Sequence, residues 1–74
     1  MPTQEMRALF HPTRARILEL LRSGPSARTS LVDSAGAPFA AVAYHCRALT
    51  RSRCIRFAPG SNVESENPVF EIAS

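Results

Sequence analysis

Residues 38–51, with the sequence PFAAVAYHCRALTR, decide how the rest of this chain is interpreted. A helix turns by about 100° per residue, so a helix over this stretch divides into two faces. Val42, Cys46 and Leu49 follow the i, i+4, i+7 spacing of a buried stripe. The opposite face carries small, aromatic and cationic side chains: Ala40, Ala43, Tyr44, Arg47 and Arg51.

The outward face of this helix has the chemistry of a DNA-reading surface. Small side chains let a helix backbone come close to another surface, and arginines reach phosphates or the edges of guanine bases. We therefore expect the helix to lie in the major groove of duplex DNA. The alternative is a solvated face, in which Tyr44 is an ordinary surface tyrosine and the helix dipole favours Arg47 and Arg51.

The charge of the chain is divided unevenly along the sequence. All nine basic residues are arginines within residues 1–56, where three acidic residues leave a net charge of +6. Residues 57–74 hold three glutamates and no basic residue, a net charge of −3. A basic body is typical of nucleic-acid binding. The alternative explanation for the number of arginines is the base composition of the genome, which would favour arginine over lysine. The high alanine content of the chain agrees with this alternative.

Three further helices are expected before the central one. Pro12 suits the first turn of a helix, and Gly36 suits the end of one. Ser26 or Thr29 would cap the helix that Gly36 ends. The pattern of a helix, a short turn containing glycine and a second helix is typical of a helix-turn-helix. The expected helices cover about residues 3–10, 12–22, 27–35 and 38–51.

After Arg51 the pattern changes from helical to extended. Residues 54–58 alternate between apolar and polar side chains, and a second short strand is expected at residues 69–73. The polar segment between them contains Pro-Gly and Ser-Asn pairs, which favour turns. We therefore predict a mainly α fold with a small β-ribbon, an α+β winged helix-turn-helix, forming a single domain over residues 1–74.

Other classes of function find little support in the composition. Cys46 and Cys54 are expected to be reduced thiols, and with His11 and His45 they lack the spacing of a metal site. The adjacent pair of His45 and Cys46 would point about 100° apart on a helix, so we predict no enzyme. No segment has the length and apolarity of a membrane span or a signal peptide, so a cytoplasmic protein is expected.

Three segments together resemble winged helix-turn-helix regulators of the arsenic-repressor (ArsR) type. Residues 9–18, LFHPTRARIL, are similar to the opening helix of that family. Residues 30–36, SLVDSAG, are similar to its positioning helix and turn, and residues 42–49, VAYHCRAL, to its recognition helix. The resemblance extends over about residues 6–58 and more weakly through the wing.

The resemblance implies a prokaryotic transcription regulator that binds operator DNA, usually as a dimer. By position, it implies that the recognition helix meets the major groove, that the start of the preceding helix touches phosphate and that the wing also approaches DNA. The DNA-binding residues that the resemblance implies are Ala40, Ala43, Tyr44 and Arg47 in the recognition helix, Arg28, Thr29 and Ser30 in the preceding helix, and Asn62 in the wing. The pattern of the recognition helix adds Arg51 to this set.

The sequence departs from the family in three places. Arg53 stands where the family usually has glycine, and a left-handed conformation there would cost about 1 kcal/mol. The wing carries Glu64 and Glu66 and no basic residue, which argues against a grip on phosphate. Residues 29–36 contain no cysteine, histidine or paired acids, so no arsenic, cadmium or zinc sensing and no metal cofactor are predicted there.

The prediction from sequence is therefore duplex DNA binding, with Tyr44 and Arg47 reading bases. The chief alternative is a winged-helix module that binds another protein, which the acidic wing and an exposed position of Phe39 would suit. A third option is an architectural protein that binds DNA without sequence preference. A homodimer through residues 1–10 or an edge of the ribbon is plausible for so small a domain.

Overall fold

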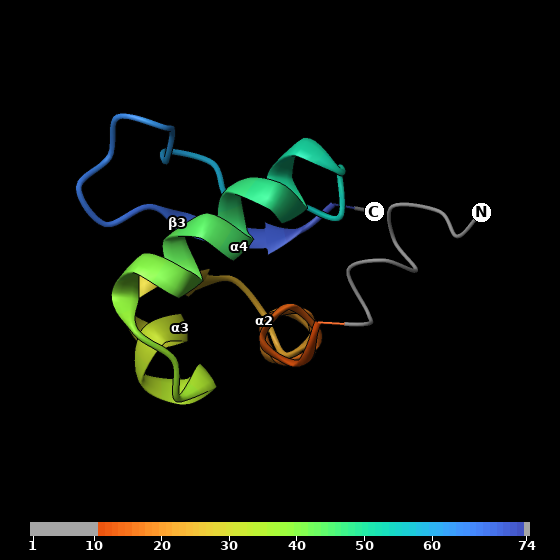
Figure 1. The fold of residues 1–74 in the computed structure, drawn as a ribbon. Helices are drawn as coiled ribbons and strands as arrows, with labels where there is room; N and C mark the ends of the chain where they lie inside the picture. Colours follow the sequence, from red (N-terminus) through yellow and green to blue (C-terminus); the bar gives the residue numbers. More distant parts are fainter. Residues whose placement is uncertain (1–10, 74) are drawn as a thin grey trace.

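The computed structural model describes residues 11–73, which form helices packed against one small sheet (Figure 1). The helix expected at residues 3–10 lies outside the described residues. The other expected helices lie within one residue of the observed ones. The elements in chain order are α2 (Pro12–Arg22), β1 (Ser26–Ala27), α3 (Arg28–Ala35), α4 (Phe39–Arg51), β2 (Ile55–Phe57) and β3 (Val69–Ile72).

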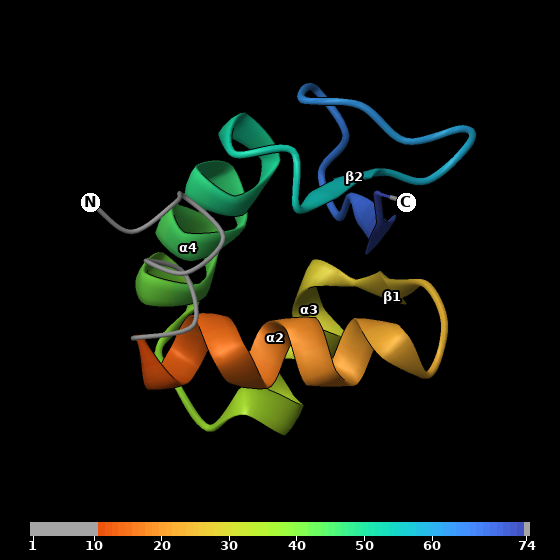
Figure 2. The same cartoon turned by 90° about the vertical axis from the view of Figure 1, so that its right-hand side faces the viewer.

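The hydrophobic core lies where the helices meet the sheet. In Figure 2, α4 stands steeply across α2, and the sheet closes the space beside them. Every described helix contributes to this core, and burial of each large apolar side chain contributes about 1.5–3 kcal/mol. Its buried members are Ile17, Leu18, Leu21, Leu31, Val42, Cys46, Leu49, Cys54, Ile55 and Phe70.

Local sequence sets the helix boundaries around the helix-turn-helix. Pro12 occupies the first turn of α2, as expected from its fixed backbone angle. Gly36 ends α3 with a φ of 66°, a left-handed conformation that glycine adopts without a Cβ clash. Only residues 36–38 then separate α3 from α4, with Pro38 in an extended conformation before the first turn. This short link fixes the angle between the two helices.

The sheet has three strands, which corrects the two-stranded ribbon predicted from sequence. Its order is β1-β3-β2, with both pairings antiparallel. The added strand pairs Ser26 with Phe70 and Ala27 with Val69. Two residues of Ser-Ala carry no alternating pattern, so the strand exists only because β3 supplies its partner. It joins the start of α3 to the wing.

The start of α3 is also capped differently from the prediction. Ala27 is the N-cap residue and makes no side-chain hydrogen bond to the helix, so neither Ser26 nor Thr29 acts as the cap. Instead, the Asn67 Oδ1 atom accepts a hydrogen bond from the Thr29 N–H at 3.1 Å, and Asn67 Nδ2 donates to Thr29 Oγ1. The wing therefore supplies a cap that lies 38 residues away in sequence.

Arg53 adopts the left-handed conformation considered from the sequence. Its φ is 61°, whereas the other positive φ values in residues 11–73 belong to glycines. The Arg53 N–H donates to the Thr50 carbonyl, and the Cys54 N–H donates to the Leu49 carbonyl, so the chain turns sharply from α4 into β2. A side chain with a Cβ is strained in this conformation.

We predict that Arg53→Gly stabilises the fold by about 1 kcal/mol, because glycine removes the left-handed strain. Urea unfolding followed by circular dichroism measures the change. Arg53→Ala is the matched control, since it removes the same charge but keeps the strained Cβ. An equal gain in both variants would show that charge, and not backbone conformation, is responsible.

Candidate nucleic-acid interface

Helix α4 has the two faces that its sequence predicts. Val42, Cys46 and Leu49 are at most 1% exposed and lie in the core. Tyr44 is 60% exposed and Arg47 is also exposed, both on the outward side. In Figure 1, α4 runs across the front of the molecule with no described segment covering it. The helix therefore presents a continuous outer face to a partner.

The predicted contact residues of α4 are brought together on this face. Ala40, Tyr44, Arg47 and Arg51 are exposed, whereas Ala43 is half-buried at the side that faces the wing. Neither Arg47 nor Arg51 takes part in an ion pair among residues 11–73, where the pairs found are Arg16 with Glu19 and Arg56 with Glu71. Both guanidinium charges are thus uncompensated by a carboxylate of the described chain.

Arg28 has a structural role that its sequence position does not reveal. Its guanidinium lies 4.6 Å from the centre of the Phe39 ring, and its Nη2 donates to the Glu66 carbonyl at 2.9 Å. The backbone N–H of Arg28 donates to the Pro68 carbonyl. Arg28 therefore links the starts of α3 and α4 to the wing, through contacts to residues 38–40 positions away that no local pattern could indicate.

The other predicted residues of α3 differ in what they offer to a partner. Thr29 is exposed, but its N–H and hydroxyl are both bonded to the side chain of Asn67. Ser30 is exposed on the first turn of the helix. A helix N-terminus favours anions. Ser30 is therefore better placed than Thr29 to meet a phosphate.

Asn62 lies in the wing, where it shapes the turn between β2 and β3. Its Oδ1 accepts a hydrogen bond from the Glu64 N–H at 2.8 Å, and its own N–H donates to Ser65 Oγ. Asparagine commonly stabilises turns in this way. Arg56, the basic residue of β2, is paired with Glu71 at 2.6 Å across the strands. Hydrogen bonds within the loop of the wing thus fix its turn, and its exposed Glu64 and Glu66 make its surface acidic.

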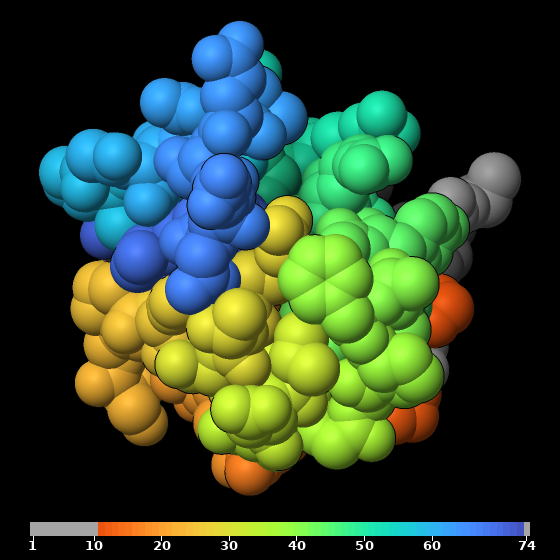
Figure 3. Space-filling view, turned by 90° about the vertical axis from the view of Figure 1, so that its left-hand side faces the viewer, coloured from red at the N-terminus to blue at the C-terminus, as the bar shows by residue number. Residues whose placement is uncertain are grey.

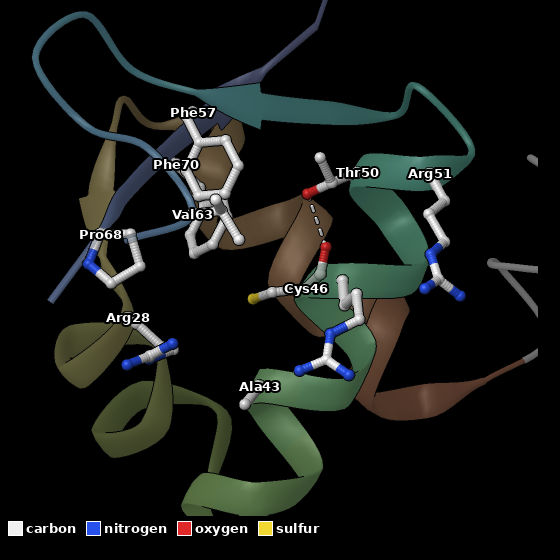
Figure 4. Close-up of a pocket in the computed structure, with 10 residues that line it drawn as sticks. Arg28, Ala43, Cys46, Thr50, Arg51, Phe57, Val63, Pro68 and Phe70 are labelled. Carbon is white, nitrogen blue, oxygen red and sulfur yellow. Dashed lines mark hydrogen bonds between the residues drawn. The ribbon is translucent and has the colours of Figure 1, made fainter. Parts of the chain in front are cut away.

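A groove separates the outer side of α4 from the wing. Figure 3 shows the face on which the wing (blue), the start of α3 (yellow) and α4 (green) come together. The groove has a volume of about 250 Å³. Figure 4 shows its lining, with Phe57, Phe70, Val63 and Pro68 on the wing side and Cys46, Thr50 and Ala43 on the helix side. Arg28, Arg47 and Arg51 complete the lining.

His45 lies on the flank of α4, where it is half-buried and hydrogen-bonded. Its Nδ1 atom accepts a hydrogen bond from Arg14 Nε at 2.9 Å, so the ring is held against α2. The His11 ring lies 5.8 Å away, between centroids. Burial and the nearby charges of Arg14 and His11 lower the pKa of His45 from 6.5. Neutral His45 therefore joins α2 to α4.

This arrangement predicts a pH dependence of stability that His45 causes. Since the folded pKa is lower than the unfolded value of 6.5, the unfolded chain binds the proton more tightly. The free energy of unfolding should therefore fall as the pH drops from about 7.5 to about 5.5. Urea unfolding at several pH values measures this slope.

His45→Asn is the matched variant for this test, since its Oδ1 can still accept from Arg14 but does not titrate. Its unfolding free energy should change less with pH over the same range. An identical slope in the natural protein and in His45→Asn would assign the pH dependence to other groups.

Burial disfavours a reactive thiolate at Cys46. Neither Cys46 nor Cys54 forms a disulfide, and both side chains are buried. Burial raises the pKa of the Cys46 thiol to about 11, although the charge of Arg28 acts in the opposite direction. A thiol with so high a pKa is a poor nucleophile at neutral pH.

Residues 11–73 contain neither a metal-binding cluster nor a helix that could span a membrane. Three or more His, Cys, Asp or Glu side chains do not gather there in a way that would hold a metal ion. The helices of this part of the chain are also too short or too polar to cross a membrane.

Comparisons with known proteins identify the fold. No protein-family model matches the sequence, and no curated protein matches it either. Solved structures do match. A homodimeric winged helix-turn-helix DNA-binding domain from Mycobacterium bovis (fragment 1-100), described as a possible ArsR-family transcriptional regulator, has a TM-score of 0.75 at 22% identity. The match covers 92% of this chain and 59% of that one.

Two further solved structures are similar to this chain in fold. The transcriptional repressor BigR from Xylella fastidiosa has a TM-score of 0.81 at 15% identity, covering 96% of this chain and 68% of that one. The Rv0081 protein of M. tuberculosis has a TM-score of 0.77 at 25% identity, with coverage of 92% and 65%. The chain therefore has the winged helix-turn-helix fold, which confirms the predicted fold class. It spans about 59–68% of the length of these three proteins.

Proposed function

We propose that this chain is a prokaryotic transcription regulator of the ArsR type that binds duplex DNA through α4. The observation that carries the proposal is the outward face of α4, which presents Tyr44 and two arginines without carboxylate partners on a winged helix-turn-helix. The similar structures include a domain described as DNA-binding and a protein described as a transcriptional repressor. A cytoplasmic, non-enzymatic protein is part of the same proposal.

The residues divide into two roles by their position on the surface. Ala40 and Ala43 would allow the first turns of α4 to enter the major groove, and Tyr44 and Arg47 would contact base edges. Phosphate contacts would come from Arg51 and from the exposed start of α3, mainly at Ser30. Arg28 and Thr29, which are bonded to the wing, would position this region and contribute less to direct contact.

The wing contributes less to DNA binding in this proposal than the helices do. Glu64 and Glu66 are exposed, and Arg56 is already paired with Glu71. Carboxylates repel phosphates, and a paired arginine releases fewer counterions on binding. Asn62 remains the wing residue proposed to approach the duplex, since its side-chain amide nitrogen can donate to a phosphate or base.

We also propose a homodimer, which would let two copies of α4 read half-sites one helical turn apart. A similar domain from Mycobacterium bovis is described as homodimeric. β1 and β2 are the outer strands of the sheet within the described chain, so their edges and residues 1–10 are the candidate contact regions.

Protein binding is the rival function, because α4 also exposes aromatic surface. Phe39 is 51% exposed and Tyr44 is 60% exposed. However, the Phe39 ring is stacked under the guanidinium of Arg28, so part of its apolar surface already has a partner. Binding to DNA should weaken steeply as salt rises, through release of counterions, whereas an apolar protein contact should not.

We predict that Arg47→Ala weakens specific DNA binding by about 1–3 kcal/mol and relaxes preference at one base pair. The target duplexes are first selected from a random pool by the natural protein, and affinity is then measured by fluorescence anisotropy. Arg22→Ala is the control. Arg22 is an exposed arginine at the end of α2, so this substitution removes the same charge at a different place on the surface.

The two variants separate the proposed base contact from a general effect of charge. If Arg47→Ala and Arg22→Ala have equal affinity and equal sequence preference, Arg47 does not contact a base, and this part of the proposal is wrong. Failure of the natural protein to select any duplex would contradict sequence-specific binding altogether.

A further inference from the structure

The groove between α4 and the wing has walls that suit a flat apolar ligand. Phe57 and Phe70 lie side by side with ring centroids 5.1 Å apart, and Pro68 continues this surface (Figure 4). The opposite wall is the side of α4 that carries Ala43, Cys46 and Thr50. Val63, at the rim, is 83% exposed and would lose that exposure beneath a ligand.

The polar part of the groove is cationic. Arg28, Arg47 and Arg51 line it, and none of them has a carboxylate partner within residues 11–73. The Nε atom of Arg28 is fully buried and has no hydrogen-bond acceptor. The wing places Glu66 beside Arg28, but the contact is to the Glu66 backbone oxygen. A ligand with a negative group would therefore meet uncompensated positive charge.

The size of the groove limits the ligand to a small molecule. Its volume is about 250 Å³. An apolar cavity of about 150 Å³ in another protein holds a benzene ring, so this groove has room for one or two fused rings and a carboxylate. Inorganic phosphate would match the arginines but would leave Val63 and the exposed part of Phe57 in contact with water. An anion with a flat aromatic body would match both the arginines and the apolar walls.

We propose that this groove binds a small aromatic carboxylate, with its ring between Phe57 and α4 and its carboxylate among the arginines. The second part of the proposal rests on the proposed function. Since Arg47 and Arg51 would serve both the ligand and DNA, the bound carboxylate opposes DNA binding. The wing and α4 would then form the site of a chemical signal as well as the DNA-binding surface.

The first experiment measures ligand binding without DNA. The protein labelled with nitrogen-15 is titrated with naphthoate and, separately, with its neutral isostere naphthamide, and amide shifts are followed by NMR. Naphthoate should shift the amides of Cys46, Phe57 and Phe70 and should bind at least about tenfold more tightly than naphthamide. Equal affinity for both compounds, or shifts confined to other surfaces, would overturn the proposal.

A variant that fills the groove gives an independent readout. Thr50 lines the groove, and it is outside the proposed DNA contacts. Thr50→Met extends a side chain into the groove and should weaken naphthoate binding at least about tenfold. Thr50→Val is the matched control, because it also loses the hydrogen bond from Thr50 Oγ1 to the Cys46 carbonyl but adds no length. Unchanged naphthoate binding in folded Thr50→Met would contradict this site.

Measurement of DNA binding in the presence of naphthoate distinguishes failure of the ligand-site proposal from failure of the proposed DNA-binding function. Naphthoate should raise the apparent dissociation constant for a selected duplex in the natural protein and in Thr50→Val, but not in Thr50→Met. DNA binding that naphthoate leaves unchanged in all three proteins would overturn the competition. Groove binding by naphthoate without any DNA binding would support the ligand site and contradict the proposed function.

Discussion

Burial of one face of α4 is the constraint on which the rest of this structure depends. Val42 and Leu49 are fully buried and Cys46 is 1% exposed, and together they fix the rotation of the helix about its own axis. Truncating a buried leucine of this kind typically costs about 2–5 kcal/mol. Since the apolar stripe cannot turn toward water without losing this energy, the opposite face, with Tyr44 and Arg47, must point outward.

The wing is tied to the same helix pair by polar contacts. Asn67 caps Thr29, Arg28 bonds to the Glu66 carbonyl, and β1 pairs with β3. These contacts place the loop of the wing beside α4, and they thereby create the groove. The wing thus forms the side of the groove opposite α4. Arg28 links α3, α4 and the wing.

Sequence alone could predict the parts of this fold that depend on local periodicity. The apolar stripe of α4, the turn at Gly36 and the position of β3 all follow from residues close together in the chain. Contacts between residues far apart in the chain produce no local pattern in the sequence from which they could be predicted. β1 has two residues and needs β3 to exist, Asn67 lies 38 residues from Thr29, and Arg14 lies 31 residues from His45. The predicted face of α4 was therefore accessible from sequence, whereas the role of Arg28 and the groove were not.

The measurement that tests the central claim most directly is NMR mapping of the protein surface that contacts DNA. Nitrogen-15-labelled protein is titrated with a short duplex at low salt, where non-specific binding also occurs. The account predicts that the largest amide shifts lie at Ala40, Ala43, Tyr44 and Arg47, with little change at Arg16 and Glu19 on the outside of α2. Shifts concentrated on α2, or none at a large excess of duplex, would contradict the claim that α4 is held outward to read DNA.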